Sequence, residues 1–399
     1  MDARSPLIQR ILPALPQQFW ILWWGTLINR VGDFVIPFLS YYLTTQLLWS
    51  TGHAALALSL FGVGSFVAQF LAGFITDRLG RKNVMLFSMF GTAVFMVALS
   101  EVRHFYLLMG VIVLLGFIMN TSRPGMKAAV ADLVPPEGRI RAYGMNYWAI
   151  NLGAAIAPIL AGLLADQNYR YLFYGDAITS TACGLLMLFF FRETLTKQQK
   201  AVSQKMRMPR DSLLYAYTFA GFLFGVLMMQ GFGVLSLAMQ KLNYSAADFG
   251  RTIAINGLII VLLGIPAQMV LPRFPRPTVM AVSALLMGVG MMMHIVAHDL
   301  TGFMIAVVVW TLGELGMNTV ASSVTADLAP AHLRGTYAGI NGAAWGLAAM
   351  VAPLFGGWLL DSYGSVTLWL SCGLIGLVIA LMHVVLAGPL KRRMESVAL

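Results

Sequence analysis

Long apolar stretches, separated by short polar turns, run along most of this 399-residue chain. Each stretch holds roughly 20 predominantly apolar residues, which is the length that a helix needs to cross the hydrocarbon core of a bilayer. The pattern predicts an all-α membrane protein with twelve membrane-spanning helices, at about 19–43, 54–75, 83–100, 105–126, 142–164, 170–191, 213–239, 251–271, 278–297, 301–325, 337–360 and 366–387.

One stretch of this pattern occurs twice. When the sequence is shifted by 195 residues, positions 131–166 fall on positions 326–361 without a gap, and fifteen of the 36 pairs are identical. A shift of nearly half the chain indicates two copies of one large unit, not a solenoid of short repeats. We therefore predict an N-terminal six-helix bundle in residues 1–191, a polar and basic linker at 192–211, and a second six-helix bundle in 212–399.

Composition supports a membrane protein and argues against an enzyme. Hydrophobic residues make up 59% of the chain, charged residues 11%, and the mean hydropathy is +0.77. A soluble domain carries roughly 25% charged residues, so most of this surface should face lipid. Cys183 and Cys372 lie in apolar runs and indicate neither a disulfide framework nor a metal site. Without a phosphate-binding loop or a metal-ligand spacing, we expect no cofactor, no metal and no catalytic residues.

The basic residues predict the orientation. If the N-terminus is cytoplasmic, nineteen Lys and Arg residues lie on the cytoplasmic side and four on the other. This is the distribution that the positive-inside rule describes. We expect a multi-pass protein of the plasma or inner membrane with both termini in the cytoplasm. The net charge of +10 then reflects topology, and no soluble face gathers it for a nucleic acid.

The turn between the second and third predicted spans carries a dense motif. It consists of Gly73, Asp77, Arg78, Gly80, Arg81 and Lys82. Glycine allows close helix approach and a tight turn, and Asp77 with Arg81 can form an ion pair that breaks when the protein changes conformation. A turn whose basic residues only hold the topology is the alternative.

These six residues match Gly-x-x-x-Asp-Arg-x-Gly-Arg-Lys, and the chain here resembles the major facilitator superfamily. The resemblance implies two six-helix bundles related by an axis along the membrane normal. It also implies that Asp132 is the partner acid of this latch, which we define as Asp77, Arg81 and Asp132. The corresponding second-copy stretch, Gln268–Pro277, has no Asp, so we expect an asymmetric latch.

The fifth span carries small residues and a proline at regular spacing, namely Gly144, Gly153, Pro158 and Gly162. Small residues form a smooth packing face, and proline removes a backbone hydrogen bond and permits a bend. The pattern resembles the antiporter signature of proton-linked drug exporters, with Ala replacing Gly at two positions. Ordinary small-residue packing between helices is the alternative.

Charged side chains inside the spans are the candidates for proton coupling, because a charge at mid-bilayer costs roughly 2.5–3.5 kcal/mol. Glu314 has no basic neighbour on its own helix, and burial then favours uptake of a proton. We predict Glu314 as the main proton carrier. Asp33 shares a helix face with Arg30, and we predict these two as a coupling pair. The alternative is that all are satisfied structural polar groups. Asp176 and His294, nearer the ends of their spans, are further candidates.

Amide, aromatic and basic side chains in the spans are the candidates for substrate binding, because such groups together suit an amphipathic solute. They are Asn29, Arg123, Tyr143, Tyr147, Asn151 and Asn318. The Tyr-Trp-Ala-x-Asn-Leu-Gly run from Tyr147 resembles both LmrP-type multidrug exporters and proton-coupled oligopeptide transporters. The first span lacks the Glu-x-x-Glu-Arg motif of the peptide branch.

The sequence thus predicts a secondary transporter that works by alternating access. We expect a monomer in the lipid bilayer that couples protons to the export of amphipathic small molecules. An uptake symporter or uniporter for a polar solute, such as a peptide or sugar-like compound, is the first alternative. A receptor or scaffold that kept the fold without transport is the second, and the intact 77–82 turn and a buried Glu314 argue against it.

Overall fold

The computed structural model describes residues 15–195, 209–328 and 334–398. Within these ranges it places Gly73 and Asp77 in a helix but does not describe their surroundings. The first half of the chain forms α2 (Gln17–Val31), α3 (Val35–Tyr41), the π-helix η1 (Tyr42–Gln46), α4 (Thr51–Leu79), α5 (Arg81–Glu101), α6 (Phe105–Leu133), α7 (Pro136–Gln167) and α8 (Arg170–Phe190). The second half forms α9 (Ser212–Met229), the π-helix η3 (Gln230–Val234), α10 (Leu235–Lys241), α11 (Ala246–Val270), the 3-10 helix η4 (Leu271–Arg273), α12 (Arg276–Met293), α13 (Leu300–Leu328), α14 (Arg334–Ser362) and α15 (Gly364–Ala398).

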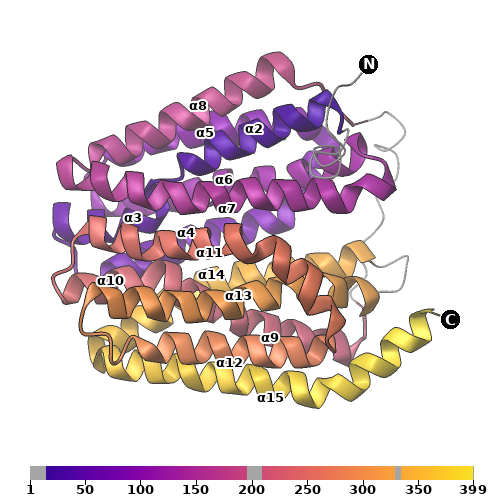
Figure 1. The fold of residues 1–399 in the computed structure, drawn as a ribbon. Coiled ribbons are helices and arrows are strands. Elements are labelled where there is room, and N and C mark those ends of the chain that lie inside the picture. The colour runs from indigo at the N-terminus through magenta and orange to yellow at the C-terminus, as the bar shows by residue number, and fades with distance from the viewer. Residues whose placement is uncertain (1–14, 196–208, 329–333, 399) are drawn as a thin grey trace.

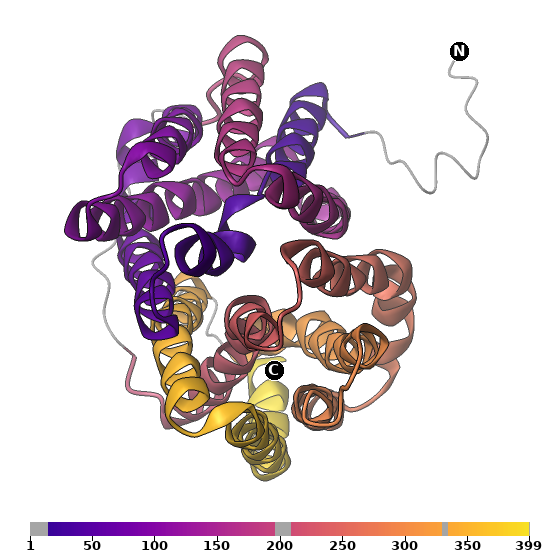
Figure 2. The ribbon, with the colours of Figure 1, turned by 90° about the vertical axis from the view of Figure 1, so that its left-hand side faces the viewer.

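These helices form two bundles, one from each half of the chain (Figure 1; Figure 2), and each bundle holds six crossings. In the described part of the chain, eleven helical runs are long and apolar enough to cross a membrane. The twelfth crossing is the interrupted run of α2, α3 and η1, which extends from Gln17 to Gln46. The predicted all-α membrane fold with twelve crossings in two bundles is confirmed. The exact limits of the two bundles at residues 192–211 stay a prediction.

The first crossing is not the continuous helix that its apolar pattern predicts. The helix α2 ends at Val31 and α3 begins at Val35. Between them the Phe34 N–H donates to the Gly32 carbonyl oxygen at 2.8 Å, which departs from the α-helical pattern. The prediction of one uninterrupted span at 19–43 is therefore wrong at Gly32–Phe34. The fourth crossing also runs past its predicted end at residue 126, because α6 continues through Pro124 to Leu133.

The same 195-residue shift relates the helices of the two bundles. The first residues of α4, α5 and α6 are Thr51, Arg81 and Phe105, and those of α11, α12 and α13 are Ala246, Arg276 and Leu300. The duplicated sequence has thus kept a duplicated helical scaffold, well beyond the stretch in which the residues are still identical.

Small residues join the two bundles along two helix pairs. A Cβ atom on Gly62 of α4 would lie 2.3 Å from the Ala349 carbonyl oxygen of α14, and one on Gly257 of α11 would lie 2.4 Å from the Ala155 nitrogen of α7. Such close backbone approach is typical of helix contacts in membranes, where van der Waals packing drives association. A larger side chain at either glycine would push the bundles apart.

The two bundles also meet through hydrogen bonds at the end of the molecule opposite the chain termini. The Ser40 and Ser236 hydroxyls lie 2.6 Å apart, and the Thr44 hydroxyl donates to the Gln240 side chain at 2.7 Å. In Figure 1 this end is on the left, and both termini lie on the right. The bundles are therefore in direct contact at the end away from the termini.

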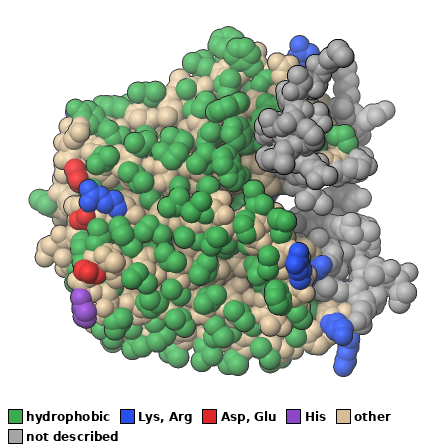
Figure 3. Space-filling model, viewed as in Figure 1, with side chains coloured by type: hydrophobic (Ala, Val, Ile, Leu, Met, Phe, Trp, Pro, Cys, Tyr) green, Lys and Arg blue, Asp and Glu red, His purple; other side chains and the backbone are tan. Residues whose placement is uncertain are grey.

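The flank of the molecule carries apolar side chains. Figure 3 shows hydrophobic groups covering the visible side, with charged groups near the two ends of the helices. Phe189, Leu374 and Val385 expose 73%, 64% and 73% of their surface. Such a continuous apolar belt is unfavourable in water and favourable in hydrocarbon. The helices are therefore oriented to cross a bilayer with the polar turns at its two faces.

Candidate functional site

A cavity of about 670 Å³ lies between the two bundles, and we call it the central cavity. A side chamber of about 410 Å³ lies in the N-terminal bundle and shares Arg123, Lys127 and Tyr147 with it. A third opening of about 470 Å³ runs between α7 and α13 and contains Tyr143, Tyr147 and Asn318. These spaces are adjacent, because Tyr147 lines all three, and we treat them as one candidate site.

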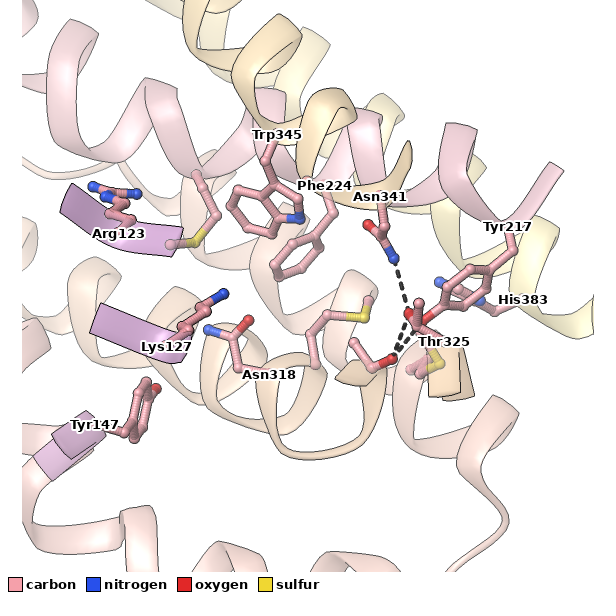
Figure 4. Close-up of a pocket in the computed structure, with 16 residues that line it drawn as sticks. Arg123, Lys127, Tyr147, Tyr217, Phe224, Asn318, Thr325, Asn341, Trp345 and His383 are labelled. Carbon is pink, nitrogen blue, oxygen red and sulfur yellow. Dashed lines mark hydrogen bonds between the residues drawn. The ribbon is translucent and has the colours of Figure 1, made fainter. Parts of the chain in front are cut away.

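Two cations of α6 face the central cavity. Arg123 and Lys127 are one helical turn apart, so they lie on the same side of α6. Both side chains are exposed although they belong to a membrane-crossing helix, because the surface they expose lines the cavity. In Figure 4 both side chains project from the visible pieces of the α6 ribbon at one end of the cavity. Among the residues that the structure describes, no Asp or Glu lines the central cavity.

The break in the first crossing places a charged pair in the side chamber. The Arg30 Nη1 atom lies 2.8 Å from the Asp33 Oδ2 atom, and each side chain is about a quarter exposed, at 26% and 25%. Asn29 also lines this chamber, together with Arg123 of α6. The structure thus brings together four of the residues that the sequence suggested: Asn29, Arg30, Asp33 and Arg123.

Asp176 lies behind this pair and is more deeply placed than its sequence position suggests. Its side chain is 1% exposed, and its Oδ1 atom accepts a hydrogen bond from the Ser180 hydroxyl at 3.3 Å. The Asn29 amide in turn donates to the Ser180 hydroxyl at 3.5 Å. A polar chain therefore links the side chamber to a buried acid. His294, by contrast, lies between the rings of Phe303 and Trp369 and away from the cavities.

Glu314 is buried in α13, directly behind the cavity wall. It is 6% exposed, and the Asn256 amide of α11 donates to its Oε2 atom at 2.6 Å. It does not line the cavity itself, but Met317 and Asn318 on the same helix do. The Asn256 partner was missed by sequence reasoning. A lone amide in an otherwise apolar span was the available signal.

The polar residues of α7 divide into those that reach the site and one that does not. Tyr147 lines the central cavity, and Tyr143 lines the opening beside it while its hydroxyl donates to the Lys127 carbonyl oxygen at 3.0 Å. Asn151 is buried and donates its amide to the Tyr147 carbonyl oxygen at 2.8 Å. Its hydrogen bond is thus satisfied within its own helix, and it lines none of the three spaces described above.

The C-terminal bundle supplies an aromatic wall that sequence reasoning missed. Phe224 of α9 and Trp345 of α14 line the central cavity, with ring centroids 6.4 Å apart. Beyond them the Asn341 amide donates to the Thr325 hydroxyl at 2.9 Å (Figure 4). In the sequence these rings resemble any other core or lipid-facing aromatic residue, so only the fold assigns them to the cavity.

The predicted latch is partly described. The Arg81 Nε atom lies 3.2 Å from the Asp132 Oδ2 atom, and the two side chains are 8% and 14% exposed. The Thr194 hydroxyl donates to the same carboxylate oxygen at 3.0 Å. The Asp77 side chain and the surroundings of Gly73 are not described, so the roles of these two residues stay predictions. Here Arg81 and Asp132 join α5 to α6 within one bundle.

Glu193, at the start of the linker, binds the turn next to the latch. Its carboxylate accepts hydrogen bonds from the backbone N–H groups of Arg81, at 2.9 Å, and Lys82, at 3.0 Å. Both groups lie at the N-terminus of α5. An anion is favourable there because the unpaired N–H groups and the helix dipole attract it. Gly80 has a φ of +99°, and a Cβ atom on it would lie 2.3 Å from this carboxylate. The glycine is thus required for both the turn and the contact.

The small residues of α7 occupy three different environments. A Cβ atom on Gly153 would lie 2.4 Å from the Arg30 Cβ atom, and one on Gly162 would lie 2.8 Å from the Ala247 Cα atom. A Cβ atom on Gly144 would meet nothing within 4 Å, and this glycine borders the opening beside Tyr143. Pro158 lies inside α7. The helix therefore packs closely against both α2 and the C-terminal bundle.

Comparison with known proteins agrees with this geometry. The sequence profile of the Major Facilitator Superfamily matches residues 22–238 and matches again over residues 217–397. The chain belongs to the major facilitator superfamily. The double match reflects the two bundles, since each half of the chain carries the profile. Members of this superfamily are membrane transporters, and the cavity between the bundles is the candidate transport site.

Two relatives and one solved structure match most of the chain. The Na(+), Li(+), K(+)/H(+) antiporter of Planococcus maritimus is 26% identical over 82% of this chain and 87% of its own length. Multidrug resistance protein MdtH of Salmonella paratyphi B is 23% identical over 87% and 89%. The crystal structure of a POT family transporter in complex with a thioalcohol-conjugated peptide has a TM-score of 0.83 at 16% identity, covering 96% and 98% of the two chains. The structural likeness concerns the fold.

Proposed function

We propose that this superfamily transporter is a proton-coupled exporter of amphipathic small molecules that works by alternating access. The observation that carries the proposal is Glu314, a buried carboxyl group one helical turn from the cavity-lining Asn318. The matches to an antiporter and to a multidrug resistance protein support the same class. We further propose that the protein lies in the plasma or inner membrane with cytoplasmic termini.

Glu314 suits proton coupling because of what surrounds it. Its described hydrogen-bond partner is the neutral amide of Asn256, at 2.6 Å. A carboxyl group in such a place changes by a full charge when it gains or loses a proton, and a buried charge is costly. A proton taken up from one side and released to the other would therefore change the stability of the two facing states. The Arg30–Asp33 pair is the second candidate in this coupling.

The cavity supports export of a solute with both polar and apolar parts. Asn29, Arg123, Tyr143, Tyr147 and Asn318 supply polar groups from both bundles. The bundles meet at the end opposite the termini, so a solute would enter from the terminal side and leave when these contacts open. The latch and Glu193 would stabilise the terminal-side turn during this change. One chain supplies both halves of the cavity, which supports work as a monomer.

Transport by the purified full chain in proteoliposomes tests the proposal. A pH gradient is imposed, and solute movement is followed together with proton movement reported by a pH-sensitive dye. We expect solute and protons to move in opposite directions. Glu314→Gln should abolish the gradient-driven movement and spare solute exchange, because the variant mimics the protonated side chain permanently.

Glu101→Gln is the matched control, since Glu101 is an acid on the surface of the molecule, with a side chain that is 53% exposed. It should transport as the unmodified chain does. Full gradient-driven accumulation by Glu314→Gln would show that Glu314 is not the proton carrier. Asp33 would then be the next candidate. Movement of solute and protons in the same direction would contradict export and indicate the uptake symporter.

A further inference from the structure

We propose that the central cavity binds amphipathic organic anions. A carboxylate, sulfonate or phosphonate group would lie between Arg123 and Lys127, and the apolar body of the solute would lie against Phe224 and Trp345. The inference rests on the proposed function in one respect: it takes the solute to be amphipathic. The inference goes beyond that function by assigning a negative charge to the solute.

The placement of the basic residues along the chain is the first observation. Of the 26 Lys and Arg residues, nineteen and four flank the spans on the two sides. The remaining three are Arg30, Arg123 and Lys127, and all three line the side chamber. A cation inside a membrane-crossing helix is unfavourable unless it has a counter-charge or water. Three cations around one site therefore call for negative charge there.

The described carboxylates supply one negative charge for these three cations. Asp33 is the one acidic residue that lines the side chamber, and its Oδ2 atom is bound to Arg30 at 2.8 Å. No described carboxylate lies within ion-pair distance of Arg123 or Lys127. Three cations at the helix ends away from the termini, by contrast, have acidic partners within the described residues: Arg170 lies 3.6 Å from Glu101, Lys241 lies 2.6 Å from Asp361 and Arg251 lies 3.7 Å from Asp248. The two α6 cations are thus left available to a ligand.

The opposite wall of the cavity suits an apolar body. In Figure 4 Trp345 and Phe224 lie between the α6 cations and Tyr217 with His383 at the far end. Met228 and Met317 add flexible thioether side chains to this wall, and methionine adapts to differently shaped ligands. A volume of about 670 Å³ is within the range of pockets that enclose drug-sized molecules. A lipophilic cation would fit the same wall but would face two like charges.

Two probes that share one apolar body test the sign of the charge on the unmodified protein. They are 1-anilinonaphthalene-8-sulfonate and N-phenyl-1-naphthylamine, which lacks the sulfonate. Each is dialysed to equilibrium against the full chain in phosphatidylcholine nanodiscs, with empty nanodiscs subtracted. We expect the sulfonate to bind about tenfold tighter or more, since hydrogen bonds to charged groups have that effect. Equal affinities would overturn the proposal, and so would tighter binding of the neutral probe.

Substitutions then locate the site. Arg123→Gln and Lys127→Gln should each weaken sulfonate binding about tenfold and change binding of the neutral probe little. Arg123→Lys, which keeps the charge, should recover most of the affinity. Arg251→Gln is the control, because Arg251 is 57% exposed and pairs with Asp248 away from the cavity. Unchanged sulfonate binding in both α6 variants would overturn the assignment to this cavity.

The experiments distinguish a failure of the anion site from a failure of proton-coupled export. If the sulfonate binds through Arg123 and Lys127 but no pH gradient drives its movement, the anion site stands and proton-coupled export fails. If a pH gradient drives export of the lipophilic cation tetraphenylphosphonium while the sulfonate does not bind, export stands and the anion site fails.

Discussion

The two bundles share a helical scaffold but differ in the charges that they bring to the cavity. Under the 195-residue shift, Arg123 of α6 corresponds to Asn318 of α13, and Glu314 of α13 corresponds to Met119 of α6. The N-terminal bundle thus supplies the cations, and the C-terminal bundle supplies Glu314 behind the cavity wall and the aromatic side chains Phe224 and Trp345. Packing needs helix spacing and small residues, so the duplicated scaffold survives while the side chains facing the cavity are free to specialise.

The first helices of the two bundles show the same division. The first crossing breaks at Gly32–Phe34, next to the Arg30–Asp33 pair. Its counterpart runs from α9 into a π-helix, where the Gln230 amide donates to the Ala352 carbonyl oxygen at 3.0 Å. Both helices are irregular inside the bundle, as membrane helices are where they line a cavity or a neighbour satisfies the backbone. The break in the first crossing lies next to a charged pair, whereas the π-helix of the second bundle holds the neutral amide of Gln230.

The largest expected effect comes from removing the charge at the first irregularity. Asp33→Asn leaves Arg30 without its counter-charge and close to Arg123, which should cost about 1–3 kcal/mol of stability and abolish gradient-driven transport. Met228→Leu, at the corresponding position of the other bundle, conserves volume and should cost less than about 1.5 kcal/mol. Thermal unfolding in detergent and proteoliposome transport measure both. Equal losses in the two variants would mean that the charge is not what distinguishes the bundles.

A smaller effect on transport is expected at the latch, whose sequence motif is intact only in the first bundle. Arg81→Gln removes the partner of a largely buried Asp132 and should cost about 1–3 kcal/mol, with a severalfold loss of transport rate. The exposed Arg192→Gln is the control and should stay near the unmodified chain. Thermal unfolding and initial transport rates decide the outcome. Identical unfolding of the two variants would show that the Arg81–Asp132 pair does not hold the turn.

The smallest expected effect is on stability and concerns the N-terminus of the first helix in each bundle. The N-cap of α9 is Asp211, whereas α2 follows Pro16 and has no side-chain cap. Burial alone would raise the pKa of Asp211, but hydrogen bonds from Tyr337 and from backbone N–H groups, with the charge of Arg393, hold that pKa below its ordinary value. The carboxylate therefore stabilises the folded state above about pH 4, and this contribution is lost as pH falls through the lowered pKa.

Asp211→Asn isolates that contribution, because Asn also caps helices well. At pH 7 the variant should be less stable by about 0.5–1 kcal/mol. The difference in unfolding temperature should shrink as the pH is lowered below about 4, where the unmodified side chain becomes neutral as well. A difference that is the same at pH 7 and pH 3 would rule out the charge as its cause.

The sequence by itself determined the class of fold and the main charged candidates. Apolar stretches of membrane length, the 195-residue repeat and the 73–82 motif are local patterns, and each can be recognised without knowing where its neighbours lie. Glu314 and Arg30–Asp33 were found in the same way, because an ionisable residue in an apolar span is conspicuous wherever that span packs.

Only the tertiary structure decided which of these residues meet. The tertiary structure interrupts the first crossing at Gly32–Phe34 and directs the Asn151 amide to a carbonyl oxygen of its own helix. It brings Asn256 into contact with Glu314, and Glu193 into contact with the start of α5. It also set the rings of Phe224 and Trp345 in the same cavity as Arg123. The physical reason is that contacts between helices depend on how each helix is rotated and offset against its neighbours. Packing over the whole chain fixes that arrangement, and no local pattern contains it.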